Sequence, residues 1–121
     1  MNQLLKGLFL CILIFSFGSG QAADLTQERW INFMTKNMPS LFCKPDQYYR
    51  DCYEVTKEEC EDTASFAVEA CIANYIQDLP DIFSYEESRK WGAVIEKCVD
   101  EEYERTYSNQ KKDTQECKEI I

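Results

Sequence analysis

Apolar side chains recur every three or four residues along two long segments of the chain. In residues 57–77 the recurring positions are Cys60, Ala64, Ala67, Cys71, Asn74 and Tyr75. In residues 85–107 they are Trp91, Val94, Ile95, Cys98, Val99, Glu102 and Tyr103. This spacing is typical of an amphipathic helix with one face on a core, so the pattern predicts two long helices.

Capping signals precede both long helices. Thr56 stands three residues before Glu59, and Ser84 stands three residues before Glu87. In such a capping box the hydroxyl accepts a backbone N–H of the first turn, and the glutamate accepts the N–H of the cap residue. Because only a few residues separate the two helices, we expect them to pack antiparallel as a hairpin.

Two shorter helices are expected before this hairpin. One covers residues 25–37, with Asp24 as its cap and Pro39 beyond its end, and the other covers residues 47–53 after Asp46. After residue 23 the chain holds three prolines and one glycine, Gly92, which is little turn punctuation for a β-sandwich. The predicted fold class is all-α, a small disulfide-stapled bundle of about four helices with a central antiparallel hairpin.

The first 23 residues have the pattern of a secretory signal peptide. Lys6 precedes an apolar run over residues 8–17, and Ala22 and Ala23 offer small side chains to a signal peptidase. The run is shorter than the roughly 20 residues that a stable membrane anchor needs. We therefore predict a signal peptide over residues 1–22, cleaved after residue 22 or 23, and a single helical cysteine-rich domain over residues 23–121. The domain is expected to be exported, periplasmic or extracellular, with no stable membrane anchor after cleavage.

Cysteine usage supports an oxidising compartment. Of the seven cysteines, Cys11 lies in the predicted signal, and six remain in the domain: Cys43, Cys52, Cys60, Cys71, Cys98 and Cys117. An even number in a small exported domain indicates three disulfides. The chain has no histidine and no Cys-x-x-Cys pair, so neither a metal site nor a thioredoxin-like redox site is expected.

The predicted helices restrict the disulfide pairing. Cys60 and Cys71 lie eleven residues apart on one helix, about 16 Å at 1.5 Å per residue. Bonded cysteines need Cα atoms within about 7 Å, so these two cannot pair. A turn centred near Asp81 would place Cys60 near Cys98. Cys71 lies nearer the turn, within reach of Cys43 in the preceding connector, which leaves Cys52 with Cys117. The predicted pairings are therefore Cys43–Cys71, Cys60–Cys98 and Cys52–Cys117.

Charge and composition exclude several function classes. The formal net charge is −9, and it becomes −10 when Lys6 leaves with the signal, so nucleic acid is not expected as a partner. Without histidine there is no Ser-His-Asp or Cys-His arrangement, and there is no glycine-rich phosphate loop. No catalytic residue and no cofactor are assigned; a hydrolase that uses paired carboxylates stays an alternative.

Aromatic side chains are the candidate contact or cavity residues. Tyrosines alone number seven in the chain, and such side chains either line a binding surface or fill a small core with their hydroxyls at its rim. Gly92, next to Trp91, is expected to let another backbone or ring approach closely. The candidates are Trp30, Tyr48, Tyr49, Tyr53, Trp91 and Tyr103.

A combination of short motifs adds a resemblance. It comprises Phe33-Met34, Leu41-Phe42-Cys43, the run from Tyr48 to Tyr53, Cys60, Cys71, Trp91-Gly92 and Cys98. Together these residues resemble small, signal-bearing, cysteine-rich helical proteins of Gram-negative gamma-proteobacteria. The resemblance implies export and a helical fold, and it carries no functional residues.

The sequence thus favours an exported, non-enzymatic protein that binds a protein partner or a small apolar ligand. The first alternative is a secreted effector or inhibitor of a host or competitor protein, to which strong acidity could contribute by steering the chain towards a basic target. The second is the carboxylate-dependent hydrolase.

Overall fold

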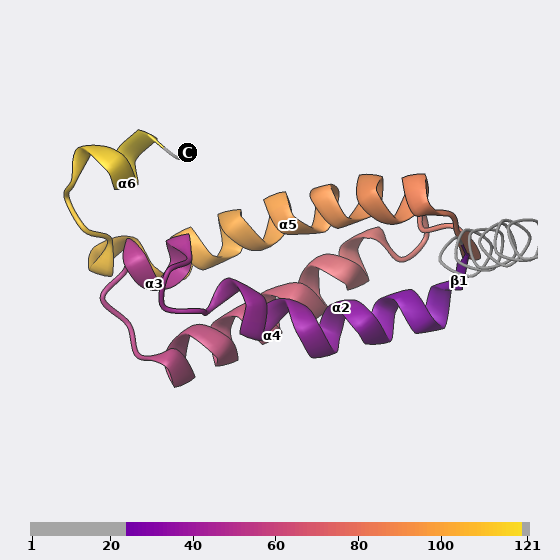
Figure 1. Ribbon diagram of the computed structural model, residues 1–121, viewed down its shortest axis with the longest axis horizontal. Helices are drawn as coiled ribbons and strands as arrows, with labels where there is room; N and C mark the ends of the chain where they lie inside the picture. Colours follow the sequence, from indigo (N-terminus) through magenta and orange to yellow (C-terminus); the bar gives the residue numbers. More distant parts are fainter. Residues whose placement is uncertain (1–23, 120–121) are drawn as a thin grey trace, which may run out of the picture.

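Three long helices lie side by side and form the body of the protein in a computed structural model that describes residues 24–119 (Figure 1). They are α2 (Gln27–Phe42), α4 (Lys57–Tyr75) and α5 (Tyr85–Tyr107). Helix α4 packs against both α2 and α5 and is antiparallel to each. The predicted signal peptide lies outside the described residues.

Short elements join and close the long helices. Helix α3 (Tyr48–Asp51) connects α2 to α4, and a 3₁₀ helix (Ser108–Gln110) and α6 (Gln115–Glu119) follow α5. Strands β1 (Leu25–Thr26) and β2 (Ile82–Phe83) pair antiparallel at the end of the bundle opposite to α3 and α6 (Figure 1). The mostly helical, disulfide-stapled fold agrees with the prediction in outline. The sequence analysis did not anticipate the strand pair, and only three of the helices are long.

Helix α4 begins where its capping box predicts. The Thr56 hydroxyl accepts the Glu59 backbone N–H at 3.1 Å, and the Glu59 carboxylate accepts the Thr56 backbone N–H at 3.0 Å. Ala64 and Ala67 are buried on this helix, and their small side chains allow its neighbours to approach closely. None of the helices among residues 24–119 has the length and apolar character that crossing a membrane requires.

Helix α2 departs from its predicted bounds at both ends. It starts at Gln27 because the two preceding residues form β1, and the Thr26 hydroxyl caps it by accepting the Arg29 N–H. It continues through Pro39, whose ring is buried, up to Phe42. Proline removes one helical hydrogen bond, and the last turn is closed by the Cys43 N–H, which donates to the Pro39 carbonyl at 3.2 Å.

The disulfides correct two of the three predicted pairs. The bonds are Cys43–Cys60, Cys52–Cys117 and Cys71–Cys98, with Cα–Cα distances of 5.8, 5.5 and 5.9 Å. The pairing of Cys52 with Cys117 was predicted. The predicted Cys43–Cys71 and Cys60–Cys98 pairs are wrong.

An uneven hairpin explains the error. Cys71 lies four residues before the end of α4 at Tyr75, whereas Cys98 lies thirteen residues after the start of α5 at Tyr85. The connection runs on past the end of α4 to place β2 beside β1, so α5 begins beyond the end of α4 (Figure 1). The turn is therefore not centred at Asp81, and Cys98 faces Cys71 instead of Cys60.

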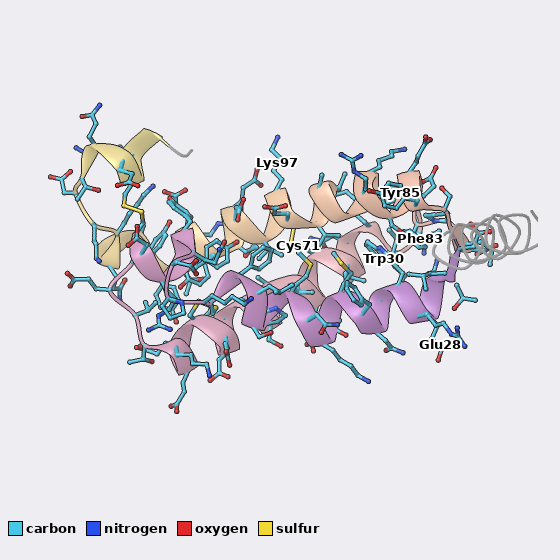
Figure 2. All side chains as sticks on the ribbon, in the orientation of Figure 1. Glu28, Trp30, Cys71, Phe83, Tyr85 and Lys97 are labelled. Atoms are coloured by element: carbon cyan, nitrogen blue, oxygen red, sulfur yellow. A yellow bond between two sulfur atoms is a disulfide. The ribbon has the colours of Figure 1, made fainter. Side chains whose placement is uncertain are left out.

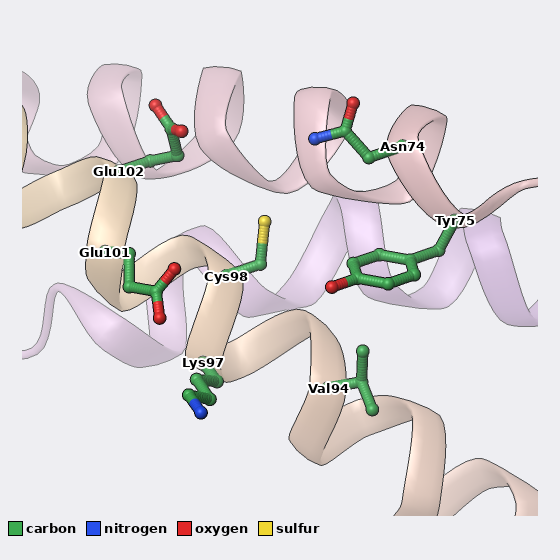
Figure 3. A pocket seen from close by; sticks show the side chains of 7 residues that line it. All are labelled: Asn74, Tyr75, Val94, Lys97, Cys98, Glu101 and Glu102. Atoms are coloured by element: carbon green, nitrogen blue, oxygen red, sulfur yellow. The ribbon is translucent and has the colours of Figure 1, made fainter.

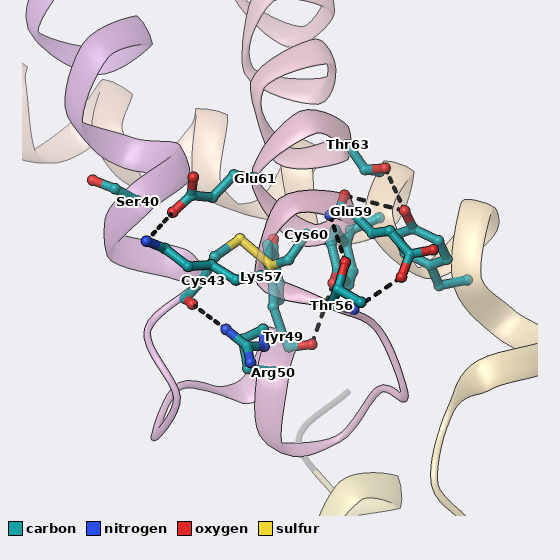
Figure 4. The surroundings of a disulfide bond; sticks show 12 residues. Ser40, Cys43, Tyr49, Arg50, Thr56, Lys57, Glu59, Cys60, Glu61 and Thr63 are labelled. Atoms are coloured by element: carbon teal, nitrogen blue, oxygen red, sulfur yellow. Dashed lines mark hydrogen bonds and ion pairs between the residues drawn. A yellow bond between two sulfur atoms is a disulfide. The ribbon is translucent and has the colours of Figure 1, made fainter.

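The Cys43–Cys60 bond then ties the end of α2 to the start of α4 (Figure 4). Around it, the Arg50 guanidinium donates to the Cys43 carbonyl at 3.3 Å. Both sulfur-bearing residues are almost fully buried, so this crosslink lies inside the bundle end where α3 also packs.

Candidate functional site

Four of the six aromatic residues selected from the sequence lie in the core. Trp30, Tyr49, Tyr53 and Tyr103 are at most 3% exposed. Trp30 stacks on Phe83 with ring centroids 4.3 Å apart, at the strand end of the bundle (Figure 2). These four therefore fill the interior, which is the alternative that the sequence left open.

The tyrosines form one connected cluster at the other end of the bundle. Tyr49 and Tyr103 stack at 4.0 Å, Tyr53 meets the edge of Tyr103 at 5.1 Å, and Tyr48 meets Tyr53 at 5.6 Å. The Tyr49 hydroxyl donates to the Asp100 carboxylate, and the Tyr103 hydroxyl donates to the Tyr49 carbonyl at 3.2 Å. The hydroxyls of Tyr48 and Tyr53 are buried without a hydrogen-bond partner among the described residues.

Burial governs the ionisation of this cluster. It raises the pKa of Tyr49, Tyr53 and Tyr103 well above the ordinary value, because a phenolate would lose its hydration there. Burial also raises the pKa of Asp100, against the opposing effect of the hydrogen bond from Tyr49. The phenol groups of Tyr49, Tyr53 and Tyr103 are thus held in their protonated, neutral form within the core.

The two remaining aromatics are partly exposed. Tyr48 has the Lys111 ammonium group 5.9 Å from its ring centre, and Lys111 is paired with Glu104 at 2.7 Å. Trp91 packs against Tyr75 at 6.0 Å, with the Lys90 ammonium group 5.5 Å from its ring centre. Either ring can contribute an edge to a contact surface.

A hollow lies between α4 and α5, beside the Cys71–Cys98 bond. It is an open groove of about 460 Å³, and Figure 3 shows the Cys98 sulfur and the Tyr75 hydroxyl pointing into the same space. Its lining combines an aromatic ring and a short aliphatic side chain with carboxylates, an amide and an amine. The lining residues are Asn74, Tyr75, Val94, Lys97, Cys98, Glu101 and Glu102.

The sequence analysis placed most of these residues in helix stripes without assigning them a site. Asn74 and Tyr75 belong to the predicted buried face of the helix over residues 57–77. Glu102 lies at the edge of the predicted buried face of the helix over residues 85–107. A polar asparagine in an otherwise apolar stripe was the available signal. It could not be interpreted without the helix register, because the register decides which α5 residues face it. Within residues 24–119, no cluster of three or more metal-ligating side chains is present.

The fold and the groove define a class: a small, mostly helical, disulfide-stapled protein with a net negative charge and an open groove between two helices. Residues 24–111 match the model of a family described as "T2SS substrate NttA", and the chain belongs to this family. T2SS is the type II secretion system, so the protein is one that is exported. Neither the curated proteins nor the solved structures contain a match to the chain.

Proposed function

We propose that this protein acts outside the producing cell as a non-enzymatic binding protein whose partner is another protein. The observation that carries the proposal is the set of large apolar side chains left exposed on a small stapled scaffold. The most exposed are Phe66 at 72%, Tyr85 at 62%, Phe33 and Ile82 at 55%, and Leu41 at 48% exposure.

Exposed aromatic side chains on a rigid support are typical of protein contact surfaces. Phe66 lies on α4 between Cys60 and Cys71, both of which are crosslinked. Tyr85 opens α5 next to the strand pair, where Ile82 is also exposed (Figure 2). Because the disulfides already hold the helices that carry these side chains, little backbone ordering is needed when a partner covers them, which favours binding.

A protein partner fits the surface better than a small apolar ligand does. The groove has carboxylates on its rim and is open, whereas sites for small apolar ligands are mostly enclosed by hydrophobic walls. Membership of a family of secreted substrates supports an extracellular place of action, as an effector or inhibitor would have.

The environment of Glu59, one of the paired carboxylates, supports the non-enzymatic part of the proposal. Glu59 accepts hydrogen bonds from the backbone and side chain of Thr56, which hold the pKa of its carboxyl below the usual range. A general acid needs the opposite shift. At the start of α5 the Ser84 hydroxyl accepts the Glu87 backbone N–H at 3.1 Å, so Glu87 lies in the first turn of that helix.

A capture experiment tests the proposal. The mature chain, purified from culture medium and immobilised, is exposed to extracts of candidate target cells, and a retained protein is purified and titrated against single variants. Replacing one of Phe33, Phe66, Ile82 or Tyr85 by serine should weaken binding at least about tenfold, as hot-spot truncations do. The control is Glu69→Gln, an exposed change on α4 that leaves the apolar side chains intact. An affinity of all four serine variants equal to that of the unmodified chain, or no protein retained above an unrelated acidic disulfide-bonded bait, would contradict the proposal.

A further inference from the structure

The C-terminal tail, residues 113–119 of the described chain, is attached to the rest of the protein mainly by one disulfide. Among the side chains of residues 113–118, only that of Cys117 is buried, and it is bonded to Cys52 at the end of α3. Helix α6 within the tail packs extensively against no other helix or strand of the described residues. Figure 1 shows it standing apart from the three long helices.

The attachment of the backbone changes at Lys112. Before this point the chain is bonded to the segment after α3, because the Glu54 N–H donates to the Gln110 carbonyl at 2.9 Å and the Lys112 N–H donates to the Cys52 carbonyl at 2.8 Å. These two backbone bonds hold the chain in register up to residue 112. The tail begins directly after them.

Contacts within the tail do not fasten it to the bundle. Asp113 pairs with Lys118 at 2.6 Å, and the Thr114 hydroxyl accepts the Cys117 N–H at 3.2 Å, so both contacts join tail residues to each other. Helix α6 has five residues, whereas an isolated helix is marginal in water below about 12–15 residues. The helical form of the tail therefore depends on its crosslink.

The other two disulfides join elements that also pack through apolar side chains. Cys71 and Cys98 lie on α4 and α5, which pack against each other and bury Val68 and Val99. This packing remains when the bond is lost, and the same holds for α2 and α4 beside the Cys43–Cys60 bond. The residues that match the family model, 24–111, also exclude the tail, which is consistent with a bundle that folds without it.

We propose that the Cys52–Cys117 bond is a redox-sensitive clasp: a dithiol reductant opens it, and the tail then detaches and unfolds while residues 25–112 keep their fold. Fraying of the short, exposed α6 presents the Cys117 sulfur to the reductant. The clasp closes in the oxidising surroundings of an exported protein and opens in a reducing compartment such as the cytosol of another cell. This inference concerns the fold alone and does not depend on which partner the protein binds.

The opening reaction is ordinary thiol–disulfide exchange. One thiolate of the reductant attacks a sulfur of the bond and forms a mixed disulfide with it, and the other cysteine leaves as a thiolate and takes up a proton. The second thiol of the reductant then displaces the first cysteine. The reductant ends as a disulfide, and the protein gains two electrons and two protons as two thiols.

Backbone dynamics of a variant without the clasp test the conformational part. In the ¹⁵N-labelled mature chain, the order parameters of residues 113–119 should be near those of the helices, about 0.85, and in Cys52→Ala/Cys117→Ala they should fall below about 0.6. The amide shifts of residues 57–75 and 85–103 should be retained in that variant. Asp113→Asn is the control, because it removes the exposed ion pair and keeps the crosslink, so its tail should stay ordered. An ordered tail or an unfolded bundle in the alanine variant, or a released tail in Asp113→Asn, would overturn the inference.

Titration with dithiothreitol tests the redox part on the unmodified chain. The loss of tail order should rise in proportion to the fraction of Cys52 and Cys117 that iodoacetamide alkylates, as mapped by mass spectrometry. Removal of the reductant before alkylation and reoxidation in air should restore the ordered tail. A Cys52–Cys117 bond that resists reduction until the bundle itself unfolds, or a tail that stays ordered after both cysteines are alkylated, would contradict the clasp.

Discussion

At the scale of single residues, two neighbouring tyrosines of the cluster differ in one respect. Tyr49 donates its hydroxyl proton to Asp100, whereas the hydroxyl of Tyr53 is buried without a partner among the described residues. Both rings pack against Tyr103. A change to phenylalanine keeps the ring and removes only the hydroxyl, so it isolates the hydrogen bond.

These two changes should act in opposite directions on stability. Tyr49→Phe should lower the free energy of unfolding by about 1.5 kcal/mol, because it removes a hydrogen bond to a charged group. Tyr53→Phe should raise it by about 1 kcal/mol, because an unsatisfied buried hydroxyl is lost. Urea denaturation of both variants measures the difference. An equal loss of stability in the two would show that the Tyr53 hydroxyl has a partner.

The same cluster predicts the response to alkaline pH. The pKa of Tyr49, Tyr53 and Tyr103 is raised by burial above 10.0, so above that pH the unfolded chain releases phenolic protons that the folded chain retains. Stability should therefore be unaffected by these groups below pH 10 and fall as the pH rises beyond it. The slope is up to about 1.4 kcal/mol per pH unit for each tyrosine. Urea titrations at pH 8, 10 and 11 measure it, and constant stability across this range would refute the buried, neutral cluster.

At the scale of the elements, Gly92 on α5 shows where a local expectation was wrong. Its position beside Trp91 led us to expect a close approach by another group. A Cβ atom built at Gly92 meets nothing within 4 Å outside its own helix neighbourhood. The glycine thus lowers helix stability without a packing reason.

Gly92→Ala should therefore stabilise the protein by about 0.5–1 kcal/mol, the difference in helix propensity between the two residues. Thermal unfolding followed by circular dichroism gives the change in Tm. A lower Tm would mean that the open space beside Gly92 is occupied in the folded protein.

The long helices could be predicted from the sequence because their signals are local and repeated. Residues 85–107 were predicted as a helix with the bounds that α5 has, and the Thr56–Glu59 box marked the first turn of α4. Strands β1 and β2 have two residues each, too few for an alternating pattern to identify them. Their pairing is long-range, and it sets how far the α4–α5 connection extends.

The length of the α4–α5 connection explains why the pairing of Cys71 and the position of the groove could not be predicted. The partner of Cys71 depends on the register between α4 and α5, and the register depends on where β2 meets β1. The groove depends on the same register, because it is formed where Asn74 and Tyr75 face Val94 and Glu101. The composition of each helix could be interpreted from the sequence, whereas the relation between helices could not.

At the scale of the whole molecule, three crosslinks join all the long helices and the C-terminal tail into one scaffold. Cys43–Cys60 joins the end of α2 to α4, Cys71–Cys98 joins α4 to α5, and Cys52–Cys117 fastens α6 beside α3. Each bond should add about 3–4 kcal/mol by restricting the unfolded chain. The exposed apolar side chains and the groove are thereby held in a fixed arrangement for a partner.

The most direct test of this account is the disulfide map of the protein recovered from culture medium under non-reducing conditions. Trypsin alone leaves Cys60 and Cys71 on one peptide, residues 58–89, so a second cleavage after glutamate, at Glu61 or Glu69, is needed to separate them. Mass spectrometry should then find the pairs Cys43–Cys60, Cys52–Cys117 and Cys71–Cys98 and no free thiol in the secreted chain. Recovery of Cys43 linked to Cys71, of free thiols, or of the protein only inside the cell would contradict a secreted scaffold with this helix register.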